Sequence, residues 1–243
     1  MLYLRLKNTK SGKLRKNGTR EVIPLLMEKS KKYGKVTSET ALSRKKSLLF
    51  VGAGNAGKSQ CAHKLFDYAL DIWGGQPKIT AKLFLGGIAP IGAWQEQQEV
   101  IAWHDKTQTK GKSPAPPWKK LKSHEKDEAL VNYCLRHRSI VVIDDAHKLT
   151  GRKADLAKRC LIASKRAVLT ASEENRLPPA IRTEILRKEP QIISLSTDTA
   201  YDLTGAVVWV FIAGAVAMGA YEMAIILAGL KWLGRGRTAA RQD

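Results

Sequence analysis

The chain has 243 residues, which is enough for one α/β domain with additions at its ends. A hydrophobic content of 44% excludes a chain that is disordered throughout, and a net charge of +20 favours polyanionic partners. The three cysteines, Cys61, Cys134 and Cys160, are widely spaced and form no CxxC pair. This pattern excludes a zinc-finger spacing and is typical of reduced thiols rather than of a disulfide framework.

Residues 1–46 form a basic N-terminal arm, with 14 Lys or Arg residues against 3 Asp or Glu residues. Such a segment attracts nucleic acid or an anionic lipid surface. The alternative is a solvated, partly disordered leader that improves solubility. Within the arm, the segment REVIPLLMEKSKKY (residues 20–33) predicts a short amphipathic helix with Pro24 near its start.

Residues 47–200 alternate apolar runs with helical patterns, which predicts an α/β domain with a parallel sheet between layers of helices. The expected strands are 47–51, 81–85, 140–143, 167–170 and 191–195. Several of these runs are rich in Val, Ile and Leu and do not alternate with polar residues. Strands that are buried on both faces have this composition.

The first expected strand runs into the segment GAGNAGKS (residues 52–59), which fits GxxxxGK[ST] at every fixed position. An amphipathic segment, residues 60–73, follows it. Strand, glycine-rich loop and helix together predict a phosphate-binding loop (P-loop), in which backbone N–H groups and a helix N-terminus surround the phosphates of ATP. Lys58 is expected to reach the β- and γ-phosphates, and Ser59 to bind Mg²⁺. The residues expected to contact the nucleotide are Gly52, Ala53, Gly54, Asn55, Ala56, Gly57, Lys58, Ser59 and Gln60.

Between the second and third expected strands lies a Lys-, Pro- and Ser-rich segment, residues 104–126. Because Pro114, Pro116 and Pro117 disfavour helix and sheet, we expect a long exposed loop. Trp118 stands beside several lysines, so it could stack on a nucleic-acid base while the lysines contact phosphates. The alternative is a tryptophan packed onto the domain surface.

The second half of a nucleotide site is expected at SIVVIDDAHKL, residues 139–149. Four apolar residues lead into Asp144 and Asp145, and this strand is expected beside the P-loop strand. Asp144 would then hold Mg²⁺ through water, and Asp145 would polarise the attacking water. The alternative is a pair of acids that merely ends a strand.

The order of the P-loop, VVIDDAH and AVLTASEENRLPPAIRTEI (residues 167–185) resembles that of AAA+ ATPases, in particular the transposition and replication-initiator type. The resemblance spans residues 47–195 and is strong at the two Walker motifs. It implies that Thr170 or Ser172 is the sensor-1 residue. It also implies that Arg182 or Arg187 is an arginine finger that reaches the nucleotide of a neighbouring subunit in a homo-oligomer.

Two features depart from that family. The family usually has glutamate where this chain has Asp145, and a shorter side chain would hold water less well, so hydrolysis would be slow. The family also has a helical lid after the last strand, whereas here an apolar segment follows. ATP binding would then act as a switch more than as a source of force.

The segment 203–221 contains no charged residue and is long enough, as a helix of about 28 Å, to cross a bilayer core. Three arrangements stay open: a single span, a re-entrant hairpin within residues 203–233, and an apolar helix buried in a soluble oligomer. The sequence therefore predicts a P-loop domain (47–200) with an AAA+-like three-layer fold, preceded by the basic arm and followed by a membrane segment (201–243).

The predicted function is that of a membrane-anchored ATPase that uses ATP and Mg²⁺, assembles on ATP and acts on DNA, with the ATPase domain in the cytoplasm. The alternative is a membrane assembly or effector protein that uses the nucleotide as a switch, without nucleic acid. A nucleotide kinase is a weaker alternative, because the sequence shows no clear lid.

Overall fold

A computed structural model describes residues 2–8, 22–29, 36–54, 56–74, 79–108, 116–195, 212–214, 216–219 and 222. The chain forms two compact units, Met1–Asp198 and Thr199–Asp243, and each is described by itself. The predictions for Asn55 and Pro114 lie outside the described residues, as does most of the predicted membrane segment 203–233.

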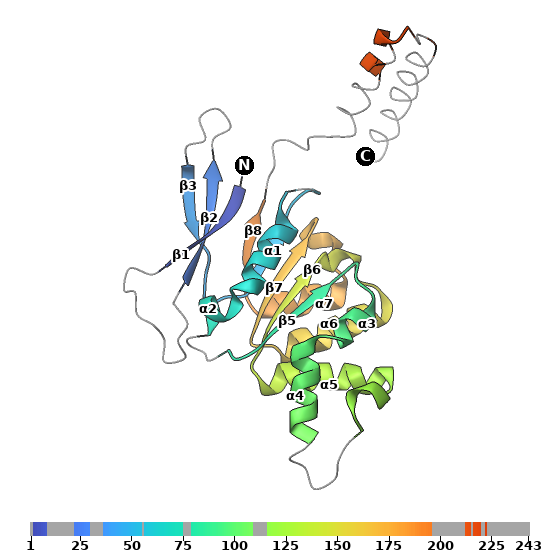
Figure 1. Cartoon of the computed structure of the whole chain (residues 1–243). Coiled ribbons are helices and arrows are strands. Elements are labelled where there is room, and N and C mark those ends of the chain that lie inside the picture. The colour runs from blue at the N-terminus through green and yellow to red at the C-terminus, as the bar shows by residue number, and fades with distance from the viewer. Residues whose placement is uncertain are drawn as a thin grey trace. The chain divides into compact units, whose positions relative to one another are not determined.

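The first unit contains a five-stranded parallel sheet, here called the main sheet (Figure 1). Its strands are β4 (Leu48–Val51), β5 (Lys82–Gly86), β6 (Ile140–Asp144), β7 (Arg166–Ala171) and β8 (Gln191–Ser194), in the spatial order β5-β6-β7-β4-β8. All five strands were predicted from the sequence to within a residue or two. An α/β fold with a five-stranded parallel sheet is the fold expected for a P-loop nucleoside triphosphatase.

The expectation that the strand before Asp144 lies beside the P-loop strand is wrong. Strand β7 lies between β6 and β4 and pairs in parallel with both. Val168 and Leu169 in β7 are fully buried, on opposite faces of the sheet. A strand that is apolar on both faces is most stable inside a sheet, with a helix layer on each side.

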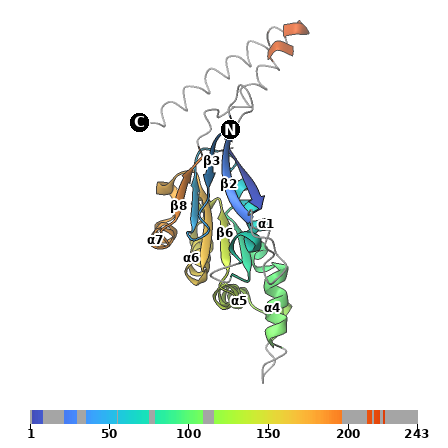
Figure 2. The ribbon, with the colours of Figure 1, turned by 90° about the vertical axis from the view of Figure 1, so that its left-hand side faces the viewer.

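Helices cover both faces of the main sheet. They are α1 (Lys58–Asp67), α2 (Ala69–Trp73), α3 (Ile91–Gln95), α4 (Gln98–Gln108), α5 (Ser123–Arg136), α6 (Gly151–Ala163) and α7 (Pro179–Arg187), with 3-10 turns η1 (Trp118–Lys120), η2 (Ala146–Lys148) and η3 (Glu174–Arg176). The predicted amphipathic segment 60–73 is present as α1 and α2. Helices α5, α6 and α7 pack side by side in sequence order (Figures 1 and 2).

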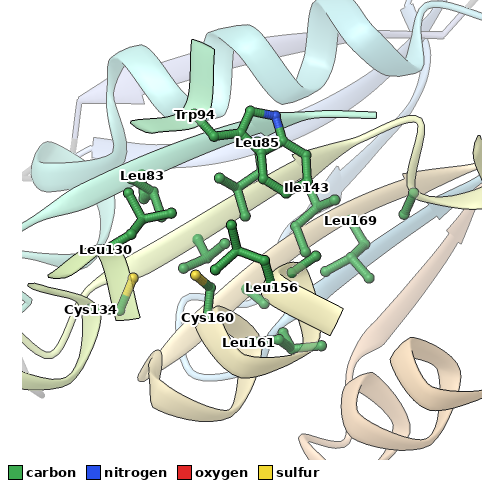
Figure 3. Close-up of a cluster of buried hydrophobic side chains, with 14 of the residues drawn as sticks. Leu83, Leu85, Trp94, Leu130, Cys134, Ile143, Leu156, Cys160, Leu161 and Leu169 are labelled. Carbon is green, nitrogen blue, oxygen red and sulfur yellow. The ribbon is translucent and has the colours of Figure 1, made fainter. Parts of the chain in front are cut away.

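Successive residues of the strands face two separate hydrophobic clusters. On one face, Leu83, Leu85, Ile143 and Leu169 pack against the helices that include α5 and α6 (Figure 3). On the other, Leu48 and Phe50 pack against α1 and α2. All three cysteines are buried and free, in agreement with the sequence prediction of reduced thiols.

The basic arm contains a three-stranded antiparallel sheet, so the amphipathic helix predicted at residues 20–33 is wrong. Its strands are β1 (Leu2–Asn8), β2 (Val22–Lys29) and β3 (Val36–Ala41), in the order β1-β2-β3. Leu4 and Leu26 belong to the same buried cluster as Phe50 of the main sheet, and the Lys64 ammonium of α1 donates to the Leu4 carbonyl (2.8 Å). Pairing with β1 and burial against α1 outweigh the local helical pattern.

The long exposed loop predicted at residues 104–126 is shorter than expected, because α4 continues to Gln108 and α5 begins at Ser123. The proposed base stacking by Trp118 is wrong, since this residue is only 5% exposed. Its ring packs edge-on against His104, with the ring centroids 5.3 Å apart. Burying the large apolar surface of the indole ring is more favourable than leaving it exposed to water.

In the second unit, residues 212–214, 216–217 and 222 are helical. Within the part of the chain that the structure describes, no helix is both long and apolar enough to cross a membrane. The predicted apolar helix or hairpin and its membrane contacts fall almost entirely outside those residues.

Candidate functional site

The P-loop connects the carboxyl end of β4 to the first turn of α1, as the sequence predicted. Gly57 caps α1 with a φ of 80°, in the left-handed region that glycine adopts at little cost. Gly52 packs against the backbone of Leu195, and a Cβ at this position would collide with the Leu195 carbonyl oxygen. Both glycines are therefore required by the backbone itself, whatever the loop binds.

Lys58 is the first residue of α1, and its side chain lies over the loop. The ammonium donates to the carbonyl oxygens of Gly52 (2.8 Å) and Ala53 (2.6 Å). Burial lowers the pKa of Lys58, while the negative charges of Asp145 and Asp144 raise it. These charges act on Lys58 because the fold brings the P-loop lysine and the two acids at the end of β6 together.

The remaining P-loop residues are arranged around this lysine. Ala56 is buried and its N–H donates to the Ala53 carbonyl (3.4 Å), which tightens the loop. Ser59 and Gln60 are exposed in the first turn of α1. The N-terminus of this helix is free of acidic side chains, so its partial positive charge and its N–H groups suit an anion.

The two acids at the end of β6 are held by one hydroxyl group. Thr170 of β7 is fully buried, and its Oγ1 donates to Asp144 Oδ1 (2.6 Å) and accepts from the Asp145 backbone N–H (2.8 Å). The position of β7 between β4 and β6 is what brings this hydroxyl group to the acids. Of the two sensor-1 candidates, Thr170 contacts both acids directly.

Asp145 has a left-handed backbone, with a φ of 52°. Aspartate and asparagine are favoured over longer side chains in this region, since their short polar groups reach their own backbone. The local backbone therefore gives a physical reason for aspartate where AAA+ ATPases usually have glutamate.

The Asp145 carboxylate also accepts from the Lys148 ammonium at 2.8 Å, three residues along the chain. This ion pair was not predicted from the sequence. The three-residue spacing between Asp145 and Lys148 is the only feature of the sequence that could have indicated it.

Two further polar groups line the same region. The Ser172 carbonyl accepts from the Gly52 N–H (3.0 Å), while the Ser172 hydroxyl is buried and has no hydrogen-bond partner among the described residues. The same holds for Nδ1 of His147. Burial lowers the pKa of His147, while the negative charge of Asp145 raises it. Sequence reasoning did not single out His147, although it directly follows the acidic pair and Ala146.

The predicted arginine fingers lie on α7 and pair with other carboxylates. Arg182 bonds Glu174 of η3 (3.0 Å), and Arg187 bonds Glu184 of its own helix (3.2 Å). The Arg187 side chain is 71% exposed. The structure thus brings Lys58, Asp144, Asp145 and Thr170 together, and leaves both arginines outside that network.

The donor groups of the site fit ATP with Mg²⁺. The Ser59 hydroxyl and the Asp144 carboxylate are hard oxygen donors, which Mg²⁺ prefers. No cluster of three or more His, Cys, Asp or Glu residues able to hold a metal is present within the described ranges. A Mg²⁺ site needs no such cluster, because this ion takes one or two protein ligands together with phosphate oxygens and water.

Comparison with known proteins gives weak likenesses. No family model and no curated protein sequence matches the chain. Among solved structures, the Aeropyrum pernix ORC1 protein in complex with DNA is 17% identical, with a TM-score of 0.39 over 66% of this chain and 42% of that chain. A point variant of Thermotoga maritima RuvB is 14% identical, with a TM-score of 0.32 over 72% and 44%.

A putative ABC transporter ATP-binding protein from Pyrococcus furiosus is 13% identical, with a TM-score of 0.27 over 68% of this chain and 86% of that chain. By contrast, this chain spans less than half the length of the ORC1 and RuvB chains that it matches. Because all these scores are low, the fold assignment rests on the main sheet and the P-loop.

The hydrogen bonds of Thr170 generate a first prediction. Thr170→Val keeps the shape of the side chain but leaves Asp144 and the Asp145 N–H without their partner, so we expect the free energy of unfolding to fall by about 1–3 kcal/mol. Ser172→Ala is the matched control, because it removes a hydroxyl that bonds nothing among the described residues. Denaturant unfolding measures both. Equal losses for the two variants would contradict the assigned role of Thr170.

Proposed function

We propose that the chain is a Mg²⁺-dependent ATPase of AAA+ type, with ATP bound across the P-loop and the acids that follow β6. The observation that carries this proposal is the convergence of Lys58, Asp144 and Asp145 at the carboxyl edge of the main sheet, where Thr170 joins the two acids. A glycine-rich turn without a nucleotide would not need the two acids beside its lysine.

In this proposal each residue has one role. Lys58 exchanges its bonds with two loop carbonyls for bonds with phosphate oxygens, and so neutralises charge on the β- and γ-phosphates. Ser59 and Asp144 would hold Mg²⁺, which supplies further neutralisation of phosphate charge. Asp145 orients the attacking water and accepts its proton. The water oxygen forms a bond to the γ-phosphorus as the bond to the ADP oxygen breaks.

Substitutions at Lys58 and Asp145 separate binding from hydrolysis. We expect Lys58→Ala to lower hydrolysis by about 10²–10³-fold, because it removes a donor aimed at developing negative charge. We expect Asp145→Asn to lower the turnover rate by about 10²–10⁴-fold and to leave ATP affinity nearly unchanged, since the amide cannot accept the proton. Asparagine also tolerates the left-handed backbone at this position.

Phosphate release and binding of a fluorescent ATP analogue are the two measurements, with Lys120→Ala, an exposed lysine of η1, as control. Normal turnover in Asp145→Asn would show that this carboxylate is not the base.

We also propose that ATP drives assembly into a homo-oligomer in which an arginine of α7 completes the site of the neighbouring subunit. Among the described residues, Arg182 and Arg187 form ion pairs that are at least partly exposed to solvent, and such pairs are exchanged at low cost. Arg187 is the more exposed of the two side chains.

We expect replacement of the arginine finger by alanine to lower the turnover rate by about 10³–10⁵-fold and to leave ATP binding intact. Mixing Arg187→Ala subunits with Lys58→Ala subunits tests this role. A mixed interface can hold an intact Lys58 site that faces an intact Arg187, so activity should recover. Failure of both the Arg182 and the Arg187 mixtures to recover would exclude a finger acting between subunits.

We propose DNA as the polyanion, on the basis of the net charge of +20. The buried Trp118 takes no part in this proposal. ATP as the ligand is consistent with an ATPase domain in the cytoplasm.

Membrane attachment through residues 203–233 is a separate proposal, supported by the uncharged segment 203–221. The alternative function, a membrane assembly or effector protein switched by nucleotide, depends on it. We expect the intact chain to float with liposomes in a density gradient and a chain that ends at Ala200 to stay at the bottom. Equal recovery of the two chains with the liposomes would remove the membrane anchor from the proposal.

A further inference from the structure

The amino edge of the main sheet, opposite the nucleotide site, is lined by basic turns. Four turns lead into β4, β8, β7 and β6, and they comprise residues 43–47, 188–190, 164–166 and 137–139. Glu189 is the only carboxylate in their sequences. The cations of this surface, called here the basic edge, are Arg44, Lys45, Lys46, Arg138, Lys165, Arg166 and Lys188.

Three of these cations lie close enough to repel one another. The pKa of Lys188 is lowered first by burial and then by the positive charges of Arg166 and Lys165, while the Glu184 carboxylate raises it by a smaller amount. Burial lowers the pKa of Arg166, and its Nε is buried without a hydrogen-bond partner among the described residues. Holding like charges together costs electrostatic free energy, and a buried donor without a partner costs more. A bound anion would offset both costs, so this arrangement suits an anion-binding surface.

Hydrogen bonds fix the positions of these turns. Lys188 Nζ donates to the Ser164 carbonyl (2.6 Å), which joins the turns before β8 and β7. Ser43 Oγ accepts from the N–H groups of Lys45 and Lys46, both at 3.2 Å. The Ser43 N–H donates to the side-chain carbonyl of Gln191 (2.7 Å). The cations are therefore presented on a scaffold that is already ordered, which lowers the entropic cost of binding.

The register of the strands sets the level of each charge at this edge. Leu48 of β4 pairs with Val168 of β7, so Lys46 and Arg166 stand at the same level, each two residues before this pair. The strands β6, β7, β4 and β8 are consecutive neighbours. Glu189 stands at the level of Lys46, and Arg138 lies two residues before the level of Arg166. At about 4.8 Å per strand the four turns together span about 14 Å, close to the axial length of four base pairs of DNA.

We propose that the basic edge binds the phosphate backbone of DNA. The four turns contain no Phe, Trp, Tyr, Leu, Ile or Val, so they offer no large apolar side chain for insertion into lipid. Their one aromatic ring, that of His137, packs against Trp103 and Tyr133. Contact through lysine and arginine alone positions a nucleic acid without reading its sequence. The choice of DNA rests on the proposed function. The proposed DNA contact lies at the amino edge of the main sheet, opposite the ATP site, and not in the Trp118 loop.

The test compares two double variants that lose the same charge. Lys46→Gln with Lys165→Gln removes two exposed cations of the basic edge, and Lys119→Gln with Lys120→Gln removes two exposed cations beside Trp118. Binding of a labelled mixed-sequence DNA duplex is measured between about 50 and 200 mM salt, together with binding of a fluorescent ATP analogue.

We expect the edge variant to reduce the slope of log affinity against log salt by about 2, while the control variant leaves it unchanged. Equal effects of the two variants, or an unchanged slope in the edge variant, would overturn the proposal. ATP binding should be the same in all three proteins, because the two edges are separate. A wild type that binds DNA but not ATP would refute the proposed ATPase and leave the basic edge intact.

Vesicles that contain an anionic lipid form the last arm of the test, since Leu135, Ile162 and Leu186 are exposed in the last turns of α5, α6 and α7. We expect the edge substitutions to weaken DNA binding more than vesicle binding. Loss of vesicle binding with unchanged DNA binding would assign the basic edge to a membrane surface and refute the proposal.

Discussion

The candidate site depends on a single shared hydroxyl group. Thr170 Oγ1 donates to one acid and accepts from the backbone of the next, so it fixes both the carboxylate of Asp144 and the turn at Asp145. Because it is fully buried, water does not compete for either bond. Lys58, which carries the opposite charge, is held separately by the carbonyl oxygens of Gly52 and Ala53.

This hydroxyl group is in place only because β7 is an interior strand. The sequence predicted the five strands, since short runs of Val, Ile and Leu are hard to bury in any other way. It did not predict their order, because strand order depends on how the connecting helices pack and not on any one run. The P-loop and the acids were found by their spacing, whereas the Asp145–Lys148 ion pair involves a lysine that looks like any other surface lysine.

Two errors have a common physical cause. The segment around Leu26 was predicted as a helix, and base stacking was proposed for Trp118 beside the alternative of packing, because both were judged from their neighbours in sequence. Each is instead buried by residues far away along the chain, Leu26 by the main sheet and Trp118 by α4. Arg182 and Arg187 could be found as candidates, but a role between subunits cannot follow from one chain.

Strand β7 has one further consequence. It begins with Arg166 at the basic edge and reaches Thr170 four residues later, about 13 Å away at about 3.3 Å per residue. It pairs with β6 at residues 166–169 and with β4 at residues 168–171, so each residue of this length is held by at least one neighbouring strand. A movement of the strand along its axis at one edge of the sheet must therefore appear at the other. A single extended segment joins the two ends of the domain mechanically, with no need for a relay of side chains.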